Sequence, residues 1–172
     1  ITGIYTKNED QFVFLDTPGI HSPKNSLGEY MVKTADSSMK EADAVVLVVD
    51  AGKEITTVEE NVIAYLKKSG IPSILVLNKI DMYNREIIAK TIPAYADKHA
   101  FIPISAKKGK NINELMDECS KFLSESDWFF PEDMITDQPE RQIAAEIIRE
   151  KILRTLNKEI PHGTAVVIEE FK

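Results

Sequence analysis

The chain has 172 residues, a formal net charge of −7 and 43% hydrophobic residues. This composition predicts a soluble globular protein with one ordinary domain and an appendage, and the negative charge gives the chain as a whole no electrostatic reason to bind nucleic acid. The longest unbroken apolar run, AVVLVV, is far too short to cross a membrane. The single cysteine, Cys119, excludes an internal disulfide, and we expect a buried thiol in a cytoplasmic protein.

Strands and helices alternate over the first 125 residues. The opening ITGIYTKNED predicts an edge strand that turns at KNED into a buried strand over 11–16. The elements that follow, in chain order, are a helix over 26–42, a strand over 43–50, a helix over 57–69, a strand over 72–78, a helix over 84–97, a strand over 100–105 and a helix over 111–125. The strands are continuous apolar runs, as expected when helices cover both faces of a sheet. The pattern therefore predicts an α/β fold with a mainly parallel sheet flanked by helices.

The sequence changes character after residue 125. The stretch SESDWFFPEDMITDQPER holds two prolines and several acids without periodicity, which predicts an ordered linker over 126–138 anchored by Trp128, Phe129 and Phe130. A helix is expected over 139–158, with Pro139 in its first turn, and a terminal strand over 164–171. The apolar stripe of that helix comprises Ile143, Ala144, Ile147, Ile148, Leu153 and Leu156. One helix and one strand cannot form a core, so we expect the start of a second, α+β domain.

Three polar residues follow the predicted strands of the sheet. Asp16, Asn78 and Ser105 each stand where a strand ends. Because ligands of open α/β sheets bind at the carboxyl ends of the strands, we expect these residues to gather at one edge.

The stretch NKID (78–81) carries the chemistry of guanine recognition. The Asp81 carboxylate can accept hydrogen bonds from the N1–H and the exocyclic amine of guanine, whereas adenine reverses this pattern. Asn78 can tie the loop to its neighbours, and the Lys79 stem can lie along the base. The alternative for Asp81 is a solvated loop acid.

The stretch SAK (105–107) complements it, because the backbone N–H of Ala106 can reach the guanine carbonyl oxygen. N-K-x-D alone is only moderately specific. Its place one strand–helix unit before S-A-K makes the combination a strong signal.

The stretch DTPG (16–19) fits the phosphate end of a nucleotide. In nucleotide hydrolases, an Asp at a strand end holds Mg²⁺ through a water, and a following Gly N–H reaches the γ-phosphate. Asp16 and Gly19 have that spacing, and the alternative for Asp16 is a cap of a turn or helix. For Gly52 we favour a plain turn, with Lys53 pointing into solvent.

D-T-P-G, N-K-x-D and S-A-K, in this order, resemble the third, fourth and fifth motifs of the translation-factor class of small GTPases. Residues 129–168 resemble the linker and the start of the C-terminal KH domain of the Era family of bacterial GTPases. The motifs alone would also fit the EngA and MnmE GTPases, and segment 129–168 favours the Era family.

The resemblance implies a P-loop-NTPase-type fold, GTP/GDP and Mg²⁺ as ligands, and a GTP-binding, slowly hydrolysing switch. Its implied partners are 16S rRNA and the small ribosomal subunit, bound through a complete KH domain during 30S assembly and 16S rRNA maturation. The resemblance alone also raises a peripheral contact with the inner membrane. The implied nucleotide-binding residues are Asp16 (also toward Mg²⁺, through water), Thr17, Gly19, Asn78, Lys79, Asp81, Ser105, Ala106 and Lys107.

Two departures from that family bear on activity. No G-x-x-x-x-G-K-[ST] phosphate loop and no KH-type G-x-x-G loop occur in the sequence, so we expect a middle section of a longer protein that is by itself inactive. The expected parts are a GTPase domain over 1–125 without its first strand–helix unit, a linker over 126–138 and the start of a KH-type domain over 139–172.

The second departure is Ile20, which replaces the Gln that orients the attacking water in Ras-like enzymes. No catalytic residue is assigned, and His21 is more simply explained as a switch-loop residue than as a substitute. Two other functions stay open: an RNA-binding or scaffold module with a non-functional nucleotide site, and another ribosome-assembly GTPase of the same superfamily.

Overall fold

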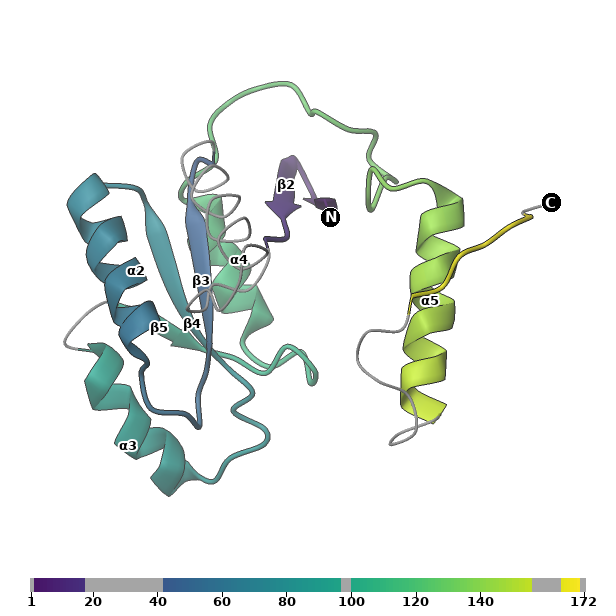
Figure 1. The fold of residues 1–172 in the computed structure, drawn as a ribbon. Coiled ribbons are helices and arrows are strands. Elements are labelled where there is room, and N and C mark those ends of the chain that lie inside the picture. Colours follow the sequence, from purple (N-terminus) through teal and green to yellow (C-terminus); the bar gives the residue numbers. More distant parts are fainter. Residues whose placement is uncertain (1, 18–41, 97–99, 156–164, 171–172) are drawn as a thin grey trace. The chain divides into compact units, whose positions relative to one another are not determined.

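The computed structural model describes residues 2–17, 42–96, 100–155 and 165–170 (Figure 1). The chain divides into two compact units, one made of Ile1–Asp16 with Trp128–Lys172 and the other of Thr17–Asp127. The helix expected over 26–42 lies, except for its last residue, outside the described residues. The domain boundaries expected from the sequence stay a prediction.

A parallel sheet forms the centre of the unit Thr17–Asp127. It comprises β3 (Val45–Asp50), β4 (Ser73–Asn78) and β5 (Phe101–Pro103), with β4 in the middle. Residues 74–77 of β4 are buried throughout, as the continuous apolar run predicted. Val48 of β3 is 55% exposed, so this strand is covered less completely. The mainly parallel α/β fold is confirmed.

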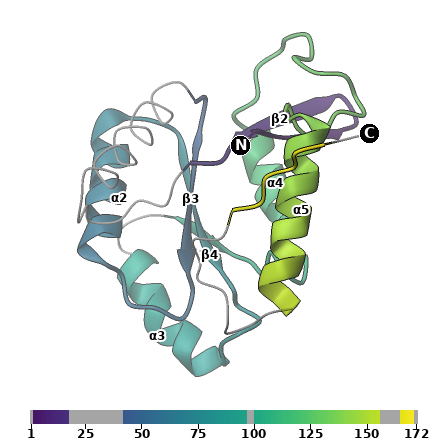
Figure 2. The same ribbon diagram turned by 45° about the vertical axis from the view of Figure 1, so that its right-hand side comes forward.

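Helices flank both faces of this sheet. Figures 1 and 2 show α2 (Thr57–Ser69) and α3 (Arg85–Ala96) on one face and α4 (Ile112–Ser120) on the other. The core between the sheet and the first two helices is formed by Val49, Ala51, Ile63, Leu75, Leu77 and Tyr95. Successive side chains of a strand point to opposite faces, so Ile74 and Val76 face the α4 side.

The helix ends follow local chemistry. The Thr56 hydroxyl accepts from the Glu59 amide and the Glu59 carboxylate accepts from the Thr56 amide, a capping box that starts α2 where the sequence predicted. Gly70, with φ +70°, ends that helix. Helix α4 is shorter than the expected 111–125, because hydrogen bonds of the i→i−3 type tighten the chain after Ser120 into turns.

The unit that contains the N-terminus begins with the expected hairpin. Strands β1 (Thr2–Lys7) and β2 (Asp10–Leu15) pair antiparallel around a turn in which Asn8 has φ 57°. The expectation of a fully buried strand over 11–16 is wrong. In β2, Phe12 is 5% exposed but Leu15 is 51% exposed, and β2 pairs only with β1 among the described strands, so a two-stranded ladder does not bury both faces.

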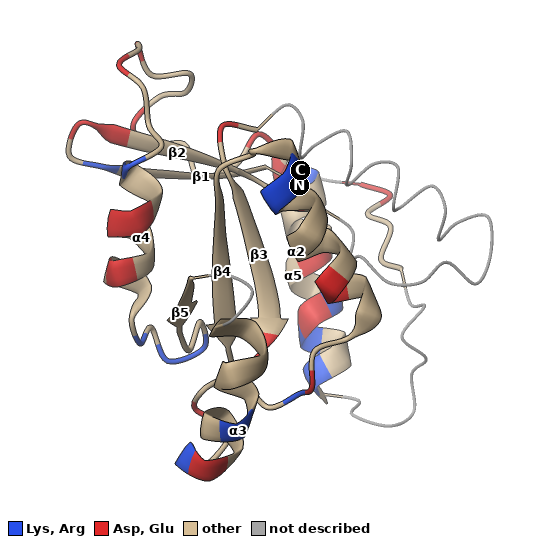
Figure 3. Ribbon diagram, turned by 90° about the vertical axis from the view of Figure 1, so that its left-hand side faces the viewer, with Lys and Arg blue, Asp and Glu red and all other residues tan. Residues whose placement is uncertain are grey.

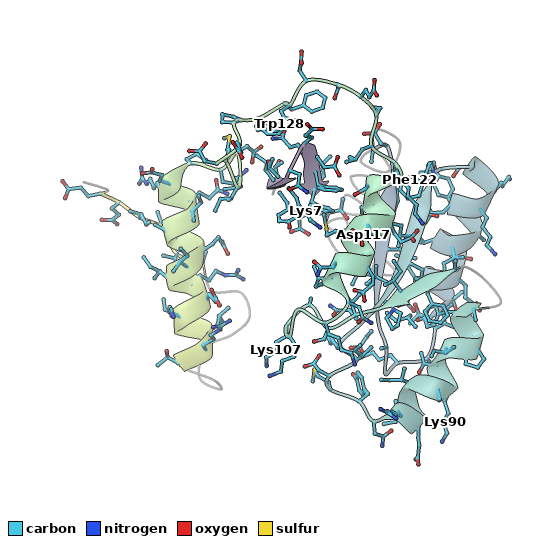
Figure 4. All side chains as sticks on the ribbon, turned by 180° about the vertical axis from the view of Figure 1, so that it is seen from behind. Lys7, Lys90, Lys107, Asp117, Phe122 and Trp128 are labelled. Carbon is cyan, nitrogen blue, oxygen red and sulfur yellow. The ribbon has the colours of Figure 1, made fainter. Side chains whose placement is uncertain are left out.

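The linker docks on this hairpin. The Trp128 indole N–H donates to the Glu9 carbonyl at 2.8 Å, and Figure 4 shows Trp128 beside the hairpin. Gln11 and the Phe130 backbone exchange two hydrogen bonds. The anchoring role expected of Trp128 and Phe130 is thus confirmed, whereas Phe129 is 79% exposed and anchors nothing.

Helix α5 (Glu140–Thr155) follows the linker within the same unit, and none of its residues is buried. Residues 165–170 cross this helix and then lead away from it (Figure 1), and the Ile168 carbonyl accepts a hydrogen bond from Arg141. The strand expected over 164–171 is not formed in residues 165–170, because a strand needs a ladder partner and none of the described strands pairs with this segment. None of the helices in the described ranges is long and apolar enough to span a membrane.

Candidate functional site

The carboxyl ends of β4 and β5 bring the stretches NKID and SAK together. Asn78 is the last residue of β4 and lies level with Asp50, the last residue of β3. Its side-chain Oδ1 accepts from the Lys79 amide at 2.7 Å and from the Ala106 amide at 3.0 Å. Asn78 therefore ties the two loops together, as the sequence predicted.

This tie changes the expectation for Ala106. Its N–H was expected to point to a ligand carbonyl, and in the structure it donates to Asn78. A guanine carbonyl oxygen that approaches this amide must share it with the Asn78 side chain or displace it. Ala106 itself is exposed, so the amide stands at the surface of the site.

A second link joins Asp81 to Ser105. The Ser105 hydroxyl donates to Asp81 Oδ1 at 2.6 Å and accepts from the Lys108 amide at 3.1 Å. Ser105 is fully buried, whereas Asp81 is exposed. The hydrogen bond from Ser105 lowers the pKa of the Asp81 carboxyl below 3.8. An ionised carboxylate is thus held in one orientation while its other oxygen lone pairs face outward for a donor.

A tight turn follows Ser105 and presents lysines. Ser105 and Lys110 exchange backbone hydrogen bonds at 3.1 Å, and Gly109 adopts φ +67°, a conformation that favours glycine. Figure 3 shows this loop before α4 as a basic segment, and Lys107 extends away from it in Figure 4. The predicted binding residue Lys107 is exposed.

The Lys79 side chain has a partner that the sequence did not indicate. The Lys79 backbone has φ 70°, and the Lys79 ammonium forms an ion pair with Asp50 Oδ2 at 2.9 Å. The Lys79 side chain is half exposed, whereas that of Asp50 is only 12% exposed. Asp50 was missed from the sequence, although it ends an apolar run as Asn78 does.

Tyr83 completes this group. Its hydroxyl hydrogen-bonds the Asp50 carboxylate, and its ring lies against Gly52 so closely that a Cβ on Gly52 would be 2.2 Å from the ring. Gly52 forms the expected turn, and its amide donates to Asp50 Oδ1 at 3.1 Å. Gly52 therefore has a packing role that the sequence did not reveal. Lys53 is exposed, as expected.

The charges in this group reinforce each other. Burial raises the pKa of the Asp50 carboxyl, but hydrogen bonds from Lys79, Gly52 and Tyr83 outweigh it, and the pKa is lowered. The hydrogen bond to Asp50 raises the pKa of the Lys79 ammonium. Both groups are therefore charged across the neutral range.

The phosphate-end residues fall at the point where the chain divides into its two units, between Asp16 and Thr17. Asp16 and Thr17 follow β2, and Asp16 is exposed. Gly19, Ile20 and His21 lie outside the described residues. No cluster of three or more metal-ligating side chains occurs in the ranges that the structure describes. One exposed carboxylate fits Mg²⁺, which keeps several waters and takes one or two carboxylates together with substrate phosphates.

Comparison with known proteins shows which protein family the chain matches. The model of the elongation factor Tu GTP-binding domain matches residues 2–125. The chain is also similar to the protein named GTPase Era from Alkaliphilus metalliredigens, with 47% identity over all of this chain. The chain spans 59% of that relative's length.

Solved structures that resemble the chain include two of Era proteins. A crystal structure of Era in complex with MgGDPNP and nucleotides 1506–1542 of 16S ribosomal RNA has 41% identity and a TM-score of 0.76, over 88% of this chain and 53% of that one. A single-residue variant of Aquifex aeolicus Era bound to GDP·AlF4⁻ has 41% identity and a TM-score of 0.75, over 89% of this chain and 54% of that one.

Proposed function

The chain belongs to the elongation factor Tu GTP-binding domain family, and on this premise we propose that it carries the guanine-recognition half of a GTPase. In the full-length protein this half serves a GTP-binding, slowly hydrolysing switch that also binds RNA. We propose GTP, GDP and Mg²⁺ as the ligands of the full-length protein and the cytoplasm as its location.

The observation that carries the proposal is the hydrogen-bonded group at the ends of β4 and β5. Asn78 holds Ala106, and Ser105 holds Asp81, so hydrogen bonds within the chain join two loops separated in sequence into one arrangement. An ionised, outward-facing carboxylate suits the two adjacent donors of guanine. Adenine offers an acceptor there, so a site built this way discriminates strongly.

We assign the residues that act at the terminal phosphate during hydrolysis to the stretch 16–20. Asp16 would hold Mg²⁺ through a water, and Thr17 and Gly19 would serve the terminal phosphate. The bound Mg²⁺ would neutralise charge that develops on the phosphates. Ile20 can neither donate nor accept a hydrogen bond through its side chain, so it cannot orient a water, and we expect slow turnover.

RNA binding is proposed from the segment after the G-domain part. A similar Era protein is described in complex with 16S ribosomal RNA nucleotides. The polar face of α5 mixes cations with acids, including the pairs Arg149–Glu146 and Arg154–Glu150. We therefore propose that the remainder of the full-length protein recognises specific RNA. We also propose that the full-length protein acts in 30S assembly and 16S rRNA maturation. A peripheral contact with the inner membrane stays a prediction.

Calorimetry with GDP, GTP, ADP and ATP on the full-length protein tests the first part. We expect at least tenfold tighter binding of the guanine nucleotides, and slow release of phosphate from GTP. Equal affinity for adenine and guanine nucleotides would contradict the proposal. For RNA, a gel-shift titration with the 3′ end of 16S rRNA should give specific binding by the full-length protein and weak, sequence-blind binding by residues 1–172.

A further inference from the structure

The side chain of Lys79 is held at both ends by other residues of the chain. At the backbone, its positive φ is held by the hydrogen bond from its amide to Asn78 Oδ1. At the tip, its ammonium lies 2.9 Å from Asp50 Oδ2. The stem between these two points therefore spans from the end of β4 to the end of β3.

Asp50 is in turn held by three contacts of its own. It pairs with Asn78 as the last residue of the parallel ladder, which fixes its backbone. Its Oδ1 accepts from the Gly52 amide, and its carboxylate also takes the Tyr83 hydroxyl. The Tyr83 ring rests on Gly52, where a side chain would collide with it. Asp50 can therefore hold the lysine in only one direction.

Stability alone does not account for this arrangement. The Lys79 ammonium is half exposed, and an ion pair with a solvated partner contributes little to folding, because solvent screens it and two side chains must be ordered. A lysine that is already ordered, however, loses less rotamer freedom when a ligand packs along its stem. The arrangement therefore suits a lysine whose stem packs against the flat face of a ligand.

We propose that Asp50, braced by Tyr83, positions the stem of Lys79 for the face of a bound guanine base. Asp50 and Tyr83 are positioning residues in this scheme, because they act through Lys79 and touch no part of the nucleotide. The inference rests on the proposed function and extends it to residues outside the N-K-x-D and S-A-K stretches.

The direction of the effect separates positioning from simple electrostatics. Asp50→Asn removes a negative charge near an anionic ligand, which by Coulomb attraction alone would tighten binding. Loss of positioning has the opposite effect and weakens binding. A positioning effect also leaves base selectivity unchanged, because the stem packs on the face of any purine whereas Asp81 reads its edge.

Calorimetry on the full-length protein, with GDP and IDP as probes, decides between them. We expect Asp50→Asn to weaken both ligands about tenfold and equally, and Tyr83→Phe to weaken both about threefold. In a Lys79→Ala background, Asp50→Asn should cause no further loss, because its effect passes through Lys79. Lys53→Ala, on the same exposed turn, is the matched control and should leave both affinities unchanged.

Several results would overturn the inference. These are unchanged or tighter GDP binding by Asp50→Asn, a loss that persists undiminished in the Lys79→Ala background, or a loss fully explained by a lower free energy of unfolding in urea. If the wild type binds guanine nucleotides and the variants give any of these results, the positioning inference is refuted and the proposed function is not. A wild-type protein that binds no guanine nucleotide refutes the proposed function, and this inference with it.

Discussion

The hydroxyl of Ser105 lies 2.6 Å from Asp81 Oδ1, with the serine fully buried and the aspartate exposed. The two residues follow neighbouring parallel strands and are 24 positions apart in the chain. A buried donor that cannot move thus holds an acceptor at the surface. The serine of the S-A-K stretch therefore serves the carboxylate of the N-K-x-D stretch and need not meet a ligand itself.

Ser105→Ala should weaken GDP binding by the full-length protein roughly tenfold, because a hydrogen bond to a charged group contributes about 1.5–3 kcal/mol and water replaces part of it. Calorimetry measures the change. Ser69→Ala removes a hydroxyl that donates to the Leu66 carbonyl at the end of α2, and is the matched control. Equal affinities of the wild type and Ser105→Ala would show that the hydroxyl does not prepare Asp81 for a ligand.

Asp81→Asn should change which base is preferred. It replaces one acceptor of the carboxylate with an amide donor, which suits the 2-position carbonyl of xanthine and faces the exocyclic amine of guanine unfavourably. We expect GDP affinity to fall at least tenfold and XDP affinity to rise, so that the preference reverses. If both affinities stay at wild-type values in calorimetry, Asp81 does not read the base.

Parts of the fold and of the site could be predicted from local signals and from one general rule of parallel sheets. The bounds of α2 match the predicted helix over 57–69, and the residues that fix them, Thr56, Glu59 and Gly70, all act within one turn of the helix ends. The meeting of Asn78 with Ala106 followed from a general rule, that parallel strands end at one edge of a sheet. Neither inference needed the register of the strands.

The parts that were missed depend on partners far away in the chain. Asp50 reaches Lys79 only because β3 and β4 pair in the register that sets Asp50 beside Asn78, which the sequence does not state. The contact of Tyr83 with Gly52 depends on the path of a loop. Likewise, the apolar run of β2 predicted a buried strand, but its burial depends on what covers it, and Leu15 is largely exposed.

The two site carboxyls should titrate below their ordinary value of 3.8, because hydrogen bonds lower the pKa of both Asp50 and Asp81. A lowered folded-state pKa adds stability that is fully present above the unfolded value and is lost as pH falls through the folded one. The raised pKa of Lys79 adds stability present below 10.5 and lost at higher pH. The ion pair and the Ser105–Asp81 contact should therefore stay intact from about pH 5 to pH 9.

Carboxyl ¹³C chemical shifts measured against pH test this titration directly. Ser105→Ala should raise the midpoint of Asp81 toward 3.8 and leave Asp50 unchanged. Lys79→Ala should raise the midpoint of Asp50, because burial then acts with fewer hydrogen bonds to oppose it. A wild-type midpoint at or above 3.8 for either residue contradicts the prediction.

Gly52→Ala should expel Tyr83 from its place. The new Cβ would lie 2.2–2.4 Å from three ring atoms, so the ring must swing away and lose its hydrogen bond to Asp50. We expect a loss of about 1 kcal/mol in the free energy of unfolding in urea, since the ring can move into solvent. Gly3→Ala is the control, because a Cβ there would meet its nearest neighbour at an ordinary 4.0 Å. In a Tyr83→Ala background the cost of Gly52→Ala should vanish, and a cost that remains would mean that Tyr83 is not the obstacle.

Gln11 should decide whether the linker stays on the hairpin. Its Nε2 donates to the Phe130 carbonyl at 2.9 Å and its Oε1 accepts from the Phe130 amide at 3.0 Å, so one side chain satisfies both backbone groups. Gln11→Ala removes both bonds, and each neutral hydrogen bond contributes about 0.5–1.5 kcal/mol. We expect the Phe130 amide to exchange its hydrogen at least tenfold faster, with faster exchange also at Ile4, whose amide donates to the Ile135 carbonyl.

Three comparisons sharpen this experiment, which is read by hydrogen exchange followed by NMR. The Met134 amide bonds to the Pro131 carbonyl within the linker, so its exchange should change less than that of Phe130. Gln11→Glu keeps an acceptor for the Phe130 amide but loses the donor to the Phe130 carbonyl, and should fall between the wild type and Gln11→Ala. Gln142→Ala, on the exposed surface of α5, should alter none of these rates. If Phe130 exchanges at the wild-type rate in Gln11→Ala, the linker is held by Trp128 and the other hairpin contacts alone.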